Sequence, residues 1–441
     1  MDGAYPKDVS QVQSTTTRRP YFPAHGDDGY RVGHYDLFLD YRITSNRLSG
    51  IARLSATASR PLERLSLDLG AFRVSAVLVD GRAVRFTHRA GKLHLTPKRP
   101  GPGPGPFTVE VHYSGAPRPV SSHWGELGWE QLDDGVIVAS QPIGAPSWFP
   151  CNDRPDDKAS YRIEITAPAA YTVVANGELA GRRRAASAVR WVYEQAEPMA
   201  TYLASVQIGR YQPTELGPRM RLFHPGRLGA RARNDFGRQD RMMALFTERF
   251  GPYPFASYTV VVTEDELEIP VEAQGMSIFG SNHVDGARGE ERLVAHELAH
   301  QWFGNSLTAA DWRDIWLHEG FATYAEWMWS EVSGGPSTTA HAAHWHRQLS
   351  ALPQDLVLAD PGVRDLFDDR VYKRGALALH ALRTYLGDLA FFSLLRTWTT
   401  ENRHGSVTTE MFVDLARQYD PRSPESFFAA WLYGSRLPPL P

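Results

Sequence analysis

The sequence is poor in cysteine, in lysine and in long hydrophobic runs. Cys151 is its one cysteine, so the chain can form neither an internal disulfide nor a cysteine-rich metal site. Lysine occurs five times, and 47 basic residues stand against 50 acidic ones, which leaves no basic excess for nucleic acid or an anionic membrane. No window approaches 18 consecutive apolar residues, and the N-terminus has no secretory apolar core. We therefore expect a cytoplasmic protein with no nucleic-acid or membrane partner, whose metal ligands, if any, are histidine and carboxylate.

The 441 residues are 42% hydrophobic, which is enough for more than one core. Residues 1–28 form a polar segment. Between residues 29 and 213, short apolar runs alternate with period two, and Asp80-Gly81 is a two-residue hairpin signal, so we expect an all-β domain there. From residue 214 to 441 the apolar period is mostly that of helices. The expected fold class is α+β.

Within the second part, specific elements follow from the pattern and its punctuation. We expect one strand at 258–262 and helices near 235–250, 291–303, 315–332, 372–385 and 408–419.

Residues 296–300 (HELAH) carry the chemistry. His296 and His300 are four residues apart, so on a helix both imidazoles lie on one face and can reach one metal ion. Glu319 follows after 18 intervening residues, at the start of a second expected helix, and offers a third ligand. Two histidines and one glutamate, with a fourth position open, describe a catalytic zinc site with one zinc per chain.

Two further glutamates belong to this pattern. Glu297 is not a ligand in this arrangement, and it can take a proton from water beside the metal and return it to a leaving amine. Its alternative reading is a solvated helix residue. Glu326 stands two helical turns after Glu319, where it can bond the far nitrogen of a zinc histidine and fix the tautomer.

Residues 296–305 (HELAHQWFGN), followed by 316–322 (WLHEGFA), resemble the zinc-binding signature of the aminopeptidase N family of gluzincin metallopeptidases. Residues 148–155 (WFPCNDRP), 198–203 (PMATYL) and 250–254 (FGPYP) are similar to other segments of that family. The resemblance implies a β-sandwich-like saddle, then a thermolysin-like catalytic domain that removes single residues from peptide N-termini. Because the sequence ends at Pro441, we expect a short, two-domain form with an open site.

The resemblance also assigns roles to residues outside the zinc signature. Tyr372, in the sequence VYKRGA, is similar to the family tyrosine that donates a hydrogen bond to the developing oxyanion; otherwise it packs the start of a helix. Glu272 aligns with the glutamate of the exopeptidase loop, which holds the free α-ammonium of the substrate. The alternative for Glu272 is one more carboxylate of the acidic run at 264–268.

One expected ammonium ligand is missing. Many family members have a glutamate or glutamine where this chain has Ile143, so Gln141 is left to contribute a carbonyl oxygen. Three functions stay open on this evidence. The first is a zinc metallo-aminopeptidase acting on peptides, the second a zinc endopeptidase that needs no free N-terminus, and the third a peptide-binding relative without turnover.

Overall fold

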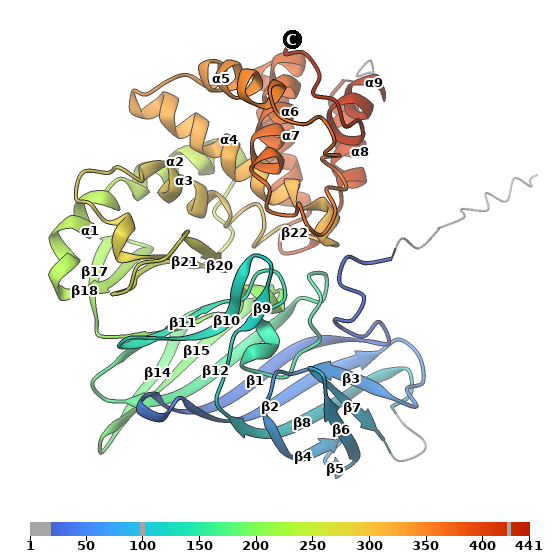
Figure 1. Cartoon of the computed structure of the whole chain (residues 1–441), viewed down its shortest axis with the longest axis vertical. Helices are drawn as coiled ribbons and strands as arrows, with labels where there is room; N and C mark the ends of the chain where they lie inside the picture. Colours follow the sequence, from blue (N-terminus) through green and yellow to red (C-terminus); the bar gives the residue numbers. More distant parts are fainter. Residues whose placement is uncertain (1–18, 98–101, 421–424) are drawn as a thin grey trace, which may run out of the picture.

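The computed structural model describes residues 19–97, 102–420 and 425–441. A part made of β-sheets lies below a mostly helical part (Figure 1). This order confirms the expected α+β class, with an all-β region first. Residues 1–18 of the expected polar segment lie outside the described residues. Residues 19–28 pack on the β part, where His25 Nδ1 lies 2.9 Å from Asp153 Oδ2 and the Gly26 N–H donates to Asp68 at 2.8 Å.

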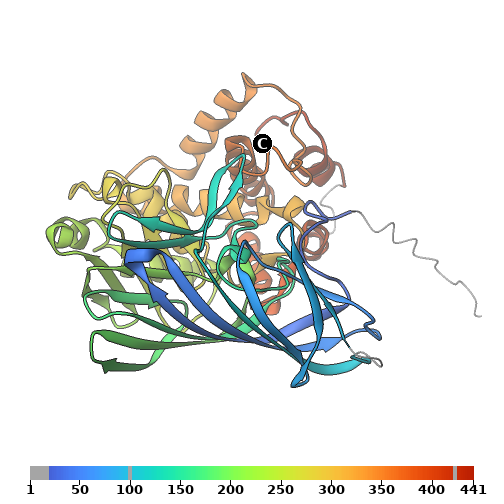
Figure 2. The same ribbon diagram turned by 60° about the horizontal axis from the view of Figure 1, so that its bottom comes forward.

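An eight-stranded sheet forms the base of the molecule, and its long twisted strands run beneath the helical part (Figure 2). In sheet order the strands are β14 (Glu178–Ala185), β15 (Ala188–Met199), β12 (Ala159–Pro168), β1 (Tyr30–Arg42), β2 (Arg47–Ala58), β8 (Gly105–Gly115), β4 (Arg73–Val79) and β5 (Arg82–Ala83). β1 and β12 pair in parallel, whereas the other pairs are antiparallel. β4 and β5 form the hairpin expected at Asp80-Gly81.

Two smaller sheets complete this part. One contains β13 (Thr172–Ala175), β16 (Val206–Gly209), β11 (Gly135–Ala139), β10 (Gly125–Leu132) and β9 (Val120–Ser122), and the other contains β3 (Leu65–Asp68), β7 (Lys92–Thr96) and β6 (Arg85–Arg89). Aromatic rings fill the core, and the stacked pair Tyr35 and Tyr161, 4.8 Å apart, joins β1 to β12. Alternating burial along β1 explains the period-two pattern, because every second side chain enters this core.

The second part begins with a five-stranded sheet. Its order is β17 (Tyr211–Gly217), β18 (Met220–Pro225), β19 (Tyr258–Val262), β21 (Met276–Phe279) and β20 (Val271–Ala273), which puts the short strand β20 at one edge. The predicted division after residue 213 falls within β17, and that division stays a prediction. Two short strands, β22 (Thr308–Ala309) and β23 (Ser406–Val407), pair beside this sheet.

Helices make up the rest of the second part. They are α1 (Gly229–Asp235), α2 (Gln239–Phe250), α3 (Glu291–Ala299), α4 (Trp316–Ser333), α5 (Thr338–Ser350), α6 (Asp369–Leu386), α7 (Asp388–Glu401), α8 (Thr409–Tyr419) and α9 (Glu425–Phe428). Among the described residues, none of these helices has the length and apolar character needed to cross a bilayer.

Contacts between the two parts fix the loop that follows α3. The ring of Tyr202, from the β part, packs edge-on against Trp312 with centroids 4.8 Å apart. Lys158, also from the β part, donates hydrogen bonds from Nζ to the carbonyl oxygens of Asn305 at 3.0 Å and Ser306 at 2.8 Å. Burial of this ammonium lowers the pKa of Lys158 to about 7. The β part therefore holds the segment between α3 and α4 in place.

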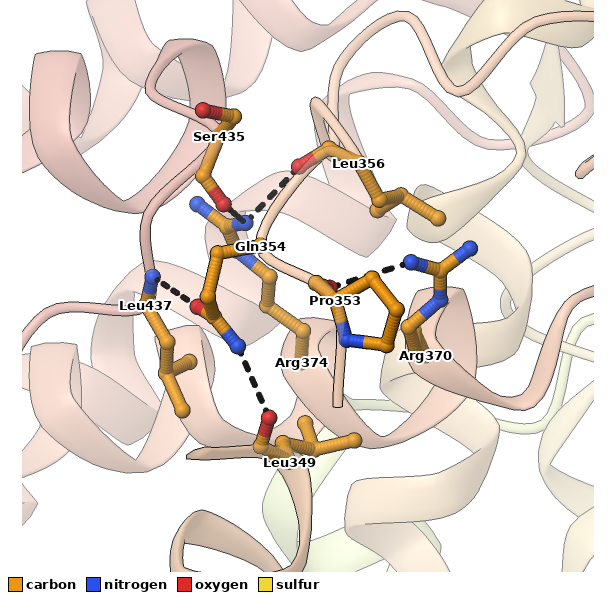
Figure 3. Close-up of a pocket in the computed structure, with 8 residues that line it drawn as sticks. All are labelled: Leu349, Pro353, Gln354, Leu356, Arg370, Arg374, Ser435 and Leu437. Atoms are coloured by element: carbon orange, nitrogen blue, oxygen red, sulfur yellow. Dashed lines mark hydrogen bonds between the residues drawn. The ribbon is translucent and has the colours of Figure 1, made fainter. Parts of the chain in front are cut away.

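The C-terminal segment folds back on α6 (Figure 3). The buried guanidinium of Arg374 donates to the carbonyl oxygens of Leu356 at 2.9 Å and Ser435 at 2.6 Å. The guanidinium donates these hydrogen bonds to backbone carbonyl groups, which carry no full charge. Burial lowers the pKa of Arg374 to about 10. Arg374 thereby ties α6, the helix that also carries Tyr372, to the end of the chain.

Candidate metal centre and active site

Three buried side chains from α3 and α4 converge on one point. His296 lies in the last turn of α3 and His300 caps its C-terminal end, and their rings are 4.7 Å apart. Oε2 of Glu319, in the first turn of α4, lies 3.3 Å from Nε2 of His296 and 3.4 Å from Nε2 of His300. The predicted ligands thus come together on two helices that face each other.

This arrangement fits a zinc ion. The two imidazole nitrogens and the carboxylate oxygen all lie within 4.8 Å of one another. Nitrogen and oxygen donors in this number are typical of catalytic zinc, which keeps its remaining position for water or substrate. Burial acts to lower the pKa of both imidazoles, but other effects outweigh it. Hydrogen bonds with Glu319 and Glu326 raise the pKa of His296 to about 9, and the negative charges of Glu319 and Glu272 raise that of His300 to about 10. Without metal, these side chains therefore hold protons, and the protons must leave when zinc binds.

The other nitrogen of each histidine also has a partner. His296 Nδ1 lies 2.7 Å from Oε1 of Glu326, two turns along α4 from Glu319, and both side chains are buried. His300 Nδ1 lies 3.0 Å from the carbonyl oxygen of Phe303. Both bonds place a proton on Nδ1 and leave Nε2 free to bind metal. The structure therefore brings Glu326 to the position that its spacing predicted.

Two glycines let α4 approach α6. A methyl group added at Gly320 would lie 2.8 Å from the Cα of Gly375, and one added at Gly375 would lie 2.7 Å from the Cα of Gly320. Any larger residue at either position would push the helices apart. Glu319 and Tyr372 stand next to this crossing, and the ring of Tyr372 lies nearly parallel to that of His296, with centroids 6.0 Å apart. Burial raises the pKa of Tyr372 well above its ordinary value, so the phenol keeps its proton and can donate it.

Two more carboxylates stand beside the ligands. Glu272, on β20, and Glu297, on α3, form with His300 a second group whose polar atoms lie within 4.8 Å of one another. Oε1 of Glu272 and Oε2 of Glu297 are both buried and have no hydrogen-bond partner in the described part of the chain. Burial raises the pKa of both groups, that of Glu297 to about 7. Within such a pair of carboxylates, one can bind a cation and the other can accept a proton.

Among the predicted site residues, Gln141 has none of the contacts described above with the other members of the site. It is half-buried at the end of β11, and its Nε2 is buried without a hydrogen-bond partner in residues 19–97, 102–420 and 425–441. Ile143 is half-buried on the same loop. The role of Gln141 in substrate binding stays a prediction.

His318 is a buried residue of the site to which the sequence pattern assigns no role. Its Nε2 accepts the N–H of Ala309 at 2.8 Å, and burial, the largest influence, lowers the pKa of His318 to about 3. The imidazole is therefore neutral, carries its proton on Nδ1 and ties the first turn of α4 to β22. In the sequence, its position directly before Glu319 is what marks it.

Known protein families match both parts of the chain. The Peptidase M1 N-terminal domain matches residues 32–203, and the Peptidase family M1 domain matches residues 235–431. An M1 zinc metallopeptidase from Deinococcus radiodurans has the same fold, with a TM-score of 0.86 and 33% identity over 95% of this chain and 98% of its own. The fold and site define a zinc metallopeptidase. The chain belongs to peptidase family M1, and zinc is therefore its metal.

Curated relatives and a bound complex add detail. Aminopeptidase B of Rattus norvegicus is 26% identical over 65% of this chain and 46% of its own length, and Leucine aminopeptidase 2 of Coccidioides immitis (strain RS) is 24% identical over 93% and 72%. The chain thus spans about half the length of the first of these. A variant of the Deinococcus radiodurans enzyme is described as bound to a Tyr-Ser-Ala substrate, with a TM-score of 0.85.

Proposed function

We propose that the protein is a zinc aminopeptidase that hydrolyses the first peptide bond of peptides with a free N-terminus. The observation that carries this proposal is the pair of buried, unpartnered carboxylates of Glu272 and Glu297 beside the three zinc ligands. A zinc hydrolase needs one base for water. A second buried carboxylate is costly unless a cation neutralises it, and a substrate ammonium is such a cation.

Glu272 would bind the α-ammonium of the substrate. It belongs to the edge strand of the catalytic sheet and is 8% exposed, so little water competes for its oxygens. A charge-assisted hydrogen bond at such a site contributes about 2 to 3 kcal/mol. The distance from Glu272 to the reacting carbonyl group then fixes cleavage after one residue. Gln141 is the second candidate for this ammonium, through its amide oxygen.

Glu297 would act as the general base and then as the general acid. Its carboxylate lies beside the ligand His300 and has one oxygen free to accept a proton from an attacking water. The same proton can then pass to the leaving amine. Zinc, held by His296, His300 and Glu319, supplies a Lewis acid that polarises the carbonyl group and lowers the pKa of water.

Tyr372 would stabilise the charge that develops on the carbonyl oxygen. Its ring stacks beside that of His296, and its high pKa keeps the phenol protonated. An O–H donor placed at the developing oxyanion is typically worth about a hundredfold in rate. The packing of α4 on α6 at Gly320 and Gly375 holds this donor next to the ligands.

A matched pair of substrates tests the proposal. An aminoacyl-coumarin and its N-acetylated twin differ only in the ammonium, and we expect the wild type to cleave the first alone. Glu272→Gln should raise KM for the free substrate by about 30- to 150-fold, which corresponds to the 2 to 3 kcal/mol above. Glu268→Gln is the control, because this residue is an exposed member of the acidic run before β20. Ready cleavage of the N-acetylated substrate would favour the endopeptidase alternative.

A further inference from the structure

The strand that carries Glu272 is too short to hold its own position. β20 contains three residues, lies at the edge of its sheet and pairs with β21 alone. A strand of this length is marginal without further support. Yet an ammonium site must keep its carboxylate within about 0.5 Å of the productive place. Other groups must therefore fix the hairpin formed by β20 and β21.

The loop after α3 supplies the first of these groups. The side-chain oxygen of Gln301 accepts the N–H of Gly275 at 2.8 Å, and its Nε2 donates to the carbonyl oxygen of Ala273 at 3.3 Å. Nδ2 of Asn305 donates to the same carbonyl oxygen at 2.9 Å. Gln301 and Asn305 are both fully buried. Together they form hydrogen bonds with the backbone before and after Gln274 in the hairpin turn.

The β part supplies the opposite side. Nδ2 of Asn176 donates to the carbonyl oxygen of Gln274 at 2.9 Å, and its Oδ1 accepts the N–H of Ser205 at 2.6 Å. The side chain of Gln274 in turn donates to the carbonyl oxygen of Glu197 at 3.2 Å. Asn176 is 1% exposed, so water does not replace these bonds. The hairpin turn is thus held between the two parts of the molecule.

These bonds connect the hairpin to the zinc ligands. Gln301 directly follows the ligand His300, and the N–H of Asn305 donates to the carbonyl oxygen of His300 at 3.0 Å. The chain segment that carries one zinc ligand therefore also holds the turn that follows Glu272.

We propose that Asn176, Gln301 and Asn305 form an amide clamp that sets the distance between Glu272 and the zinc ligands. They are positioning residues, and they act on the substrate ammonium through Glu272. This inference rests on the proposed aminopeptidase function. It also makes the β part a contributor to exopeptidase specificity, through Asn176. Side-chain amides suit this task, because Asn176 and Gln301 each give a hydrogen bond to one backbone group and take one from another, and Asn305 gives one to Ala273.

Replacing one of the clamp amides should displace the carboxylate of Glu272 and leave the residue itself unchanged. Gln301→Met keeps the size of the side chain and loses its bonds to the backbone of Gly275 and Ala273. Asn176→Ala frees the opposite side of the turn. We expect each variant to raise KM for an aminoacyl-coumarin by about tenfold, since displacements of about 1 Å at a site have effects of that order or more. Zinc content should stay at the wild-type level, and kcat should change less than KM.

A control separates this effect from the loss of an amide that bonds the backbone elsewhere in the chain. Gln354 makes the same kinds of bond at the C-terminal segment, where its Oε1 accepts the N–H of Leu437 at 2.8 Å and its Nε2 donates to the carbonyl oxygen of Leu349 at 2.8 Å (Figure 3). Gln354→Met should leave KM unchanged. If Asn176→Ala does not fold, Gln274→Met removes the bonds of the hairpin side chain to the carbonyl oxygens of Glu197 and Pro198 in the β part, and it leaves the bond from Asn176 in place.

A double variant gives the sharpest test. If the clamp acts through Glu272, adding Asn176→Ala or Gln301→Met to Glu272→Gln should raise KM no further. A second, full-sized rise in that background would overturn the clamp, as would unchanged KM in both single variants. These two outcomes count against the clamp when the wild type cleaves free substrates and leaves N-acetylated substrates uncleaved. A wild type without that preference would overturn the proposed function, and the clamp with it.

Discussion

Glu326 offers a test of the metal centre that leaves all three ligands in place. Its Oε1 lies 2.7 Å from His296 Nδ1, and both side chains are buried. Removing it with Glu326→Leu deprives the imidazole of its acceptor and so of its orientation and part of its basicity. Loss of such a partner typically lowers metal affinity about 10- to 100-fold, or about 1.4 to 2.7 kcal/mol. His300 keeps its bond to the carbonyl oxygen of Phe303, so the site should weaken and not vanish.

The assay is a zinc titration in competition with a chelator of known affinity. Glu326→Gln should fall between the wild type and Glu326→Leu, because its amide oxygen can still accept the Nδ1 proton but carries no charge. Glu331→Gln, an exposed residue on the same helix, serves as the control. Wild-type zinc affinity in Glu326→Leu, or an equal loss in the control, would refute the role given to this hydrogen bond.

The other predictions concern catalysis, stability and affinity. Glu297→Gln and Tyr372→Phe should each lower kcat by about a hundredfold or more with little change in KM, and near-normal kcat would remove that residue from the mechanism. Burial raises the pKa of Asp314 from 3.8 to about 7, so the folded chain holds this proton more tightly than the unfolded chain and its free energy of unfolding falls as pH rises from about 4 to 7. Asp314→Asn keeps an acceptor for Thr409 and should be more stable than the wild type at pH 8 by up to about 4 kcal/mol, a gain that denaturant titrations should find absent near pH 4. Ile143→Glu should lower KM for aminoacyl substrates in steady-state assays and leave N-acetylated peptides uncleaved, and an unchanged KM would mean that this loop does not face the ammonium.

Elements governed by local pattern could be predicted closely. The strand at 258–262 has the expected bounds, and α4 and α8 begin within one residue of their predicted starts. Contacts between distant segments account for the errors. The helix expected at 235–250 ends at Phe250 as predicted but begins at Gln239, because Asp235 ends the preceding helix α1 and uses its carboxylate to hold the backbone of Gly286 and Arg288. The period-two pattern of the β part does not predict the short 3-10 turn at Thr201–Leu203, where the hydroxyl of Tyr202 donates to the carbonyl oxygen of Gly304.

For the site too, spacing along a helix can be predicted from the sequence, whereas contacts with distant segments cannot. The ligand group of His296, His300 and Glu319 follows from spacing along two helices, and the structure brings all three together. Asn176 could be recognised only as part of an Asn-Gly turn, because its partner Gln274 lies 98 residues away. The helix α5 was missed, since its run of histidines and small residues has a weak apolar face. Spacing along a helix predicts the ligands and the partner Glu326, and it does not predict supports such as Asn176 that come from distant segments.

The most direct test of the central claim is mass spectrometry of the products from one peptide and its N-acetylated twin. The enzyme would be assayed as isolated, after chelation, and after zinc is restored. We predict that the free peptide loses residues one at a time from its N-terminus, that chelation stops this loss and zinc restores it, and that the acetylated twin stays intact. Internal cleavage of either peptide, or no turnover by enzyme that contains one zinc per chain, would contradict the account.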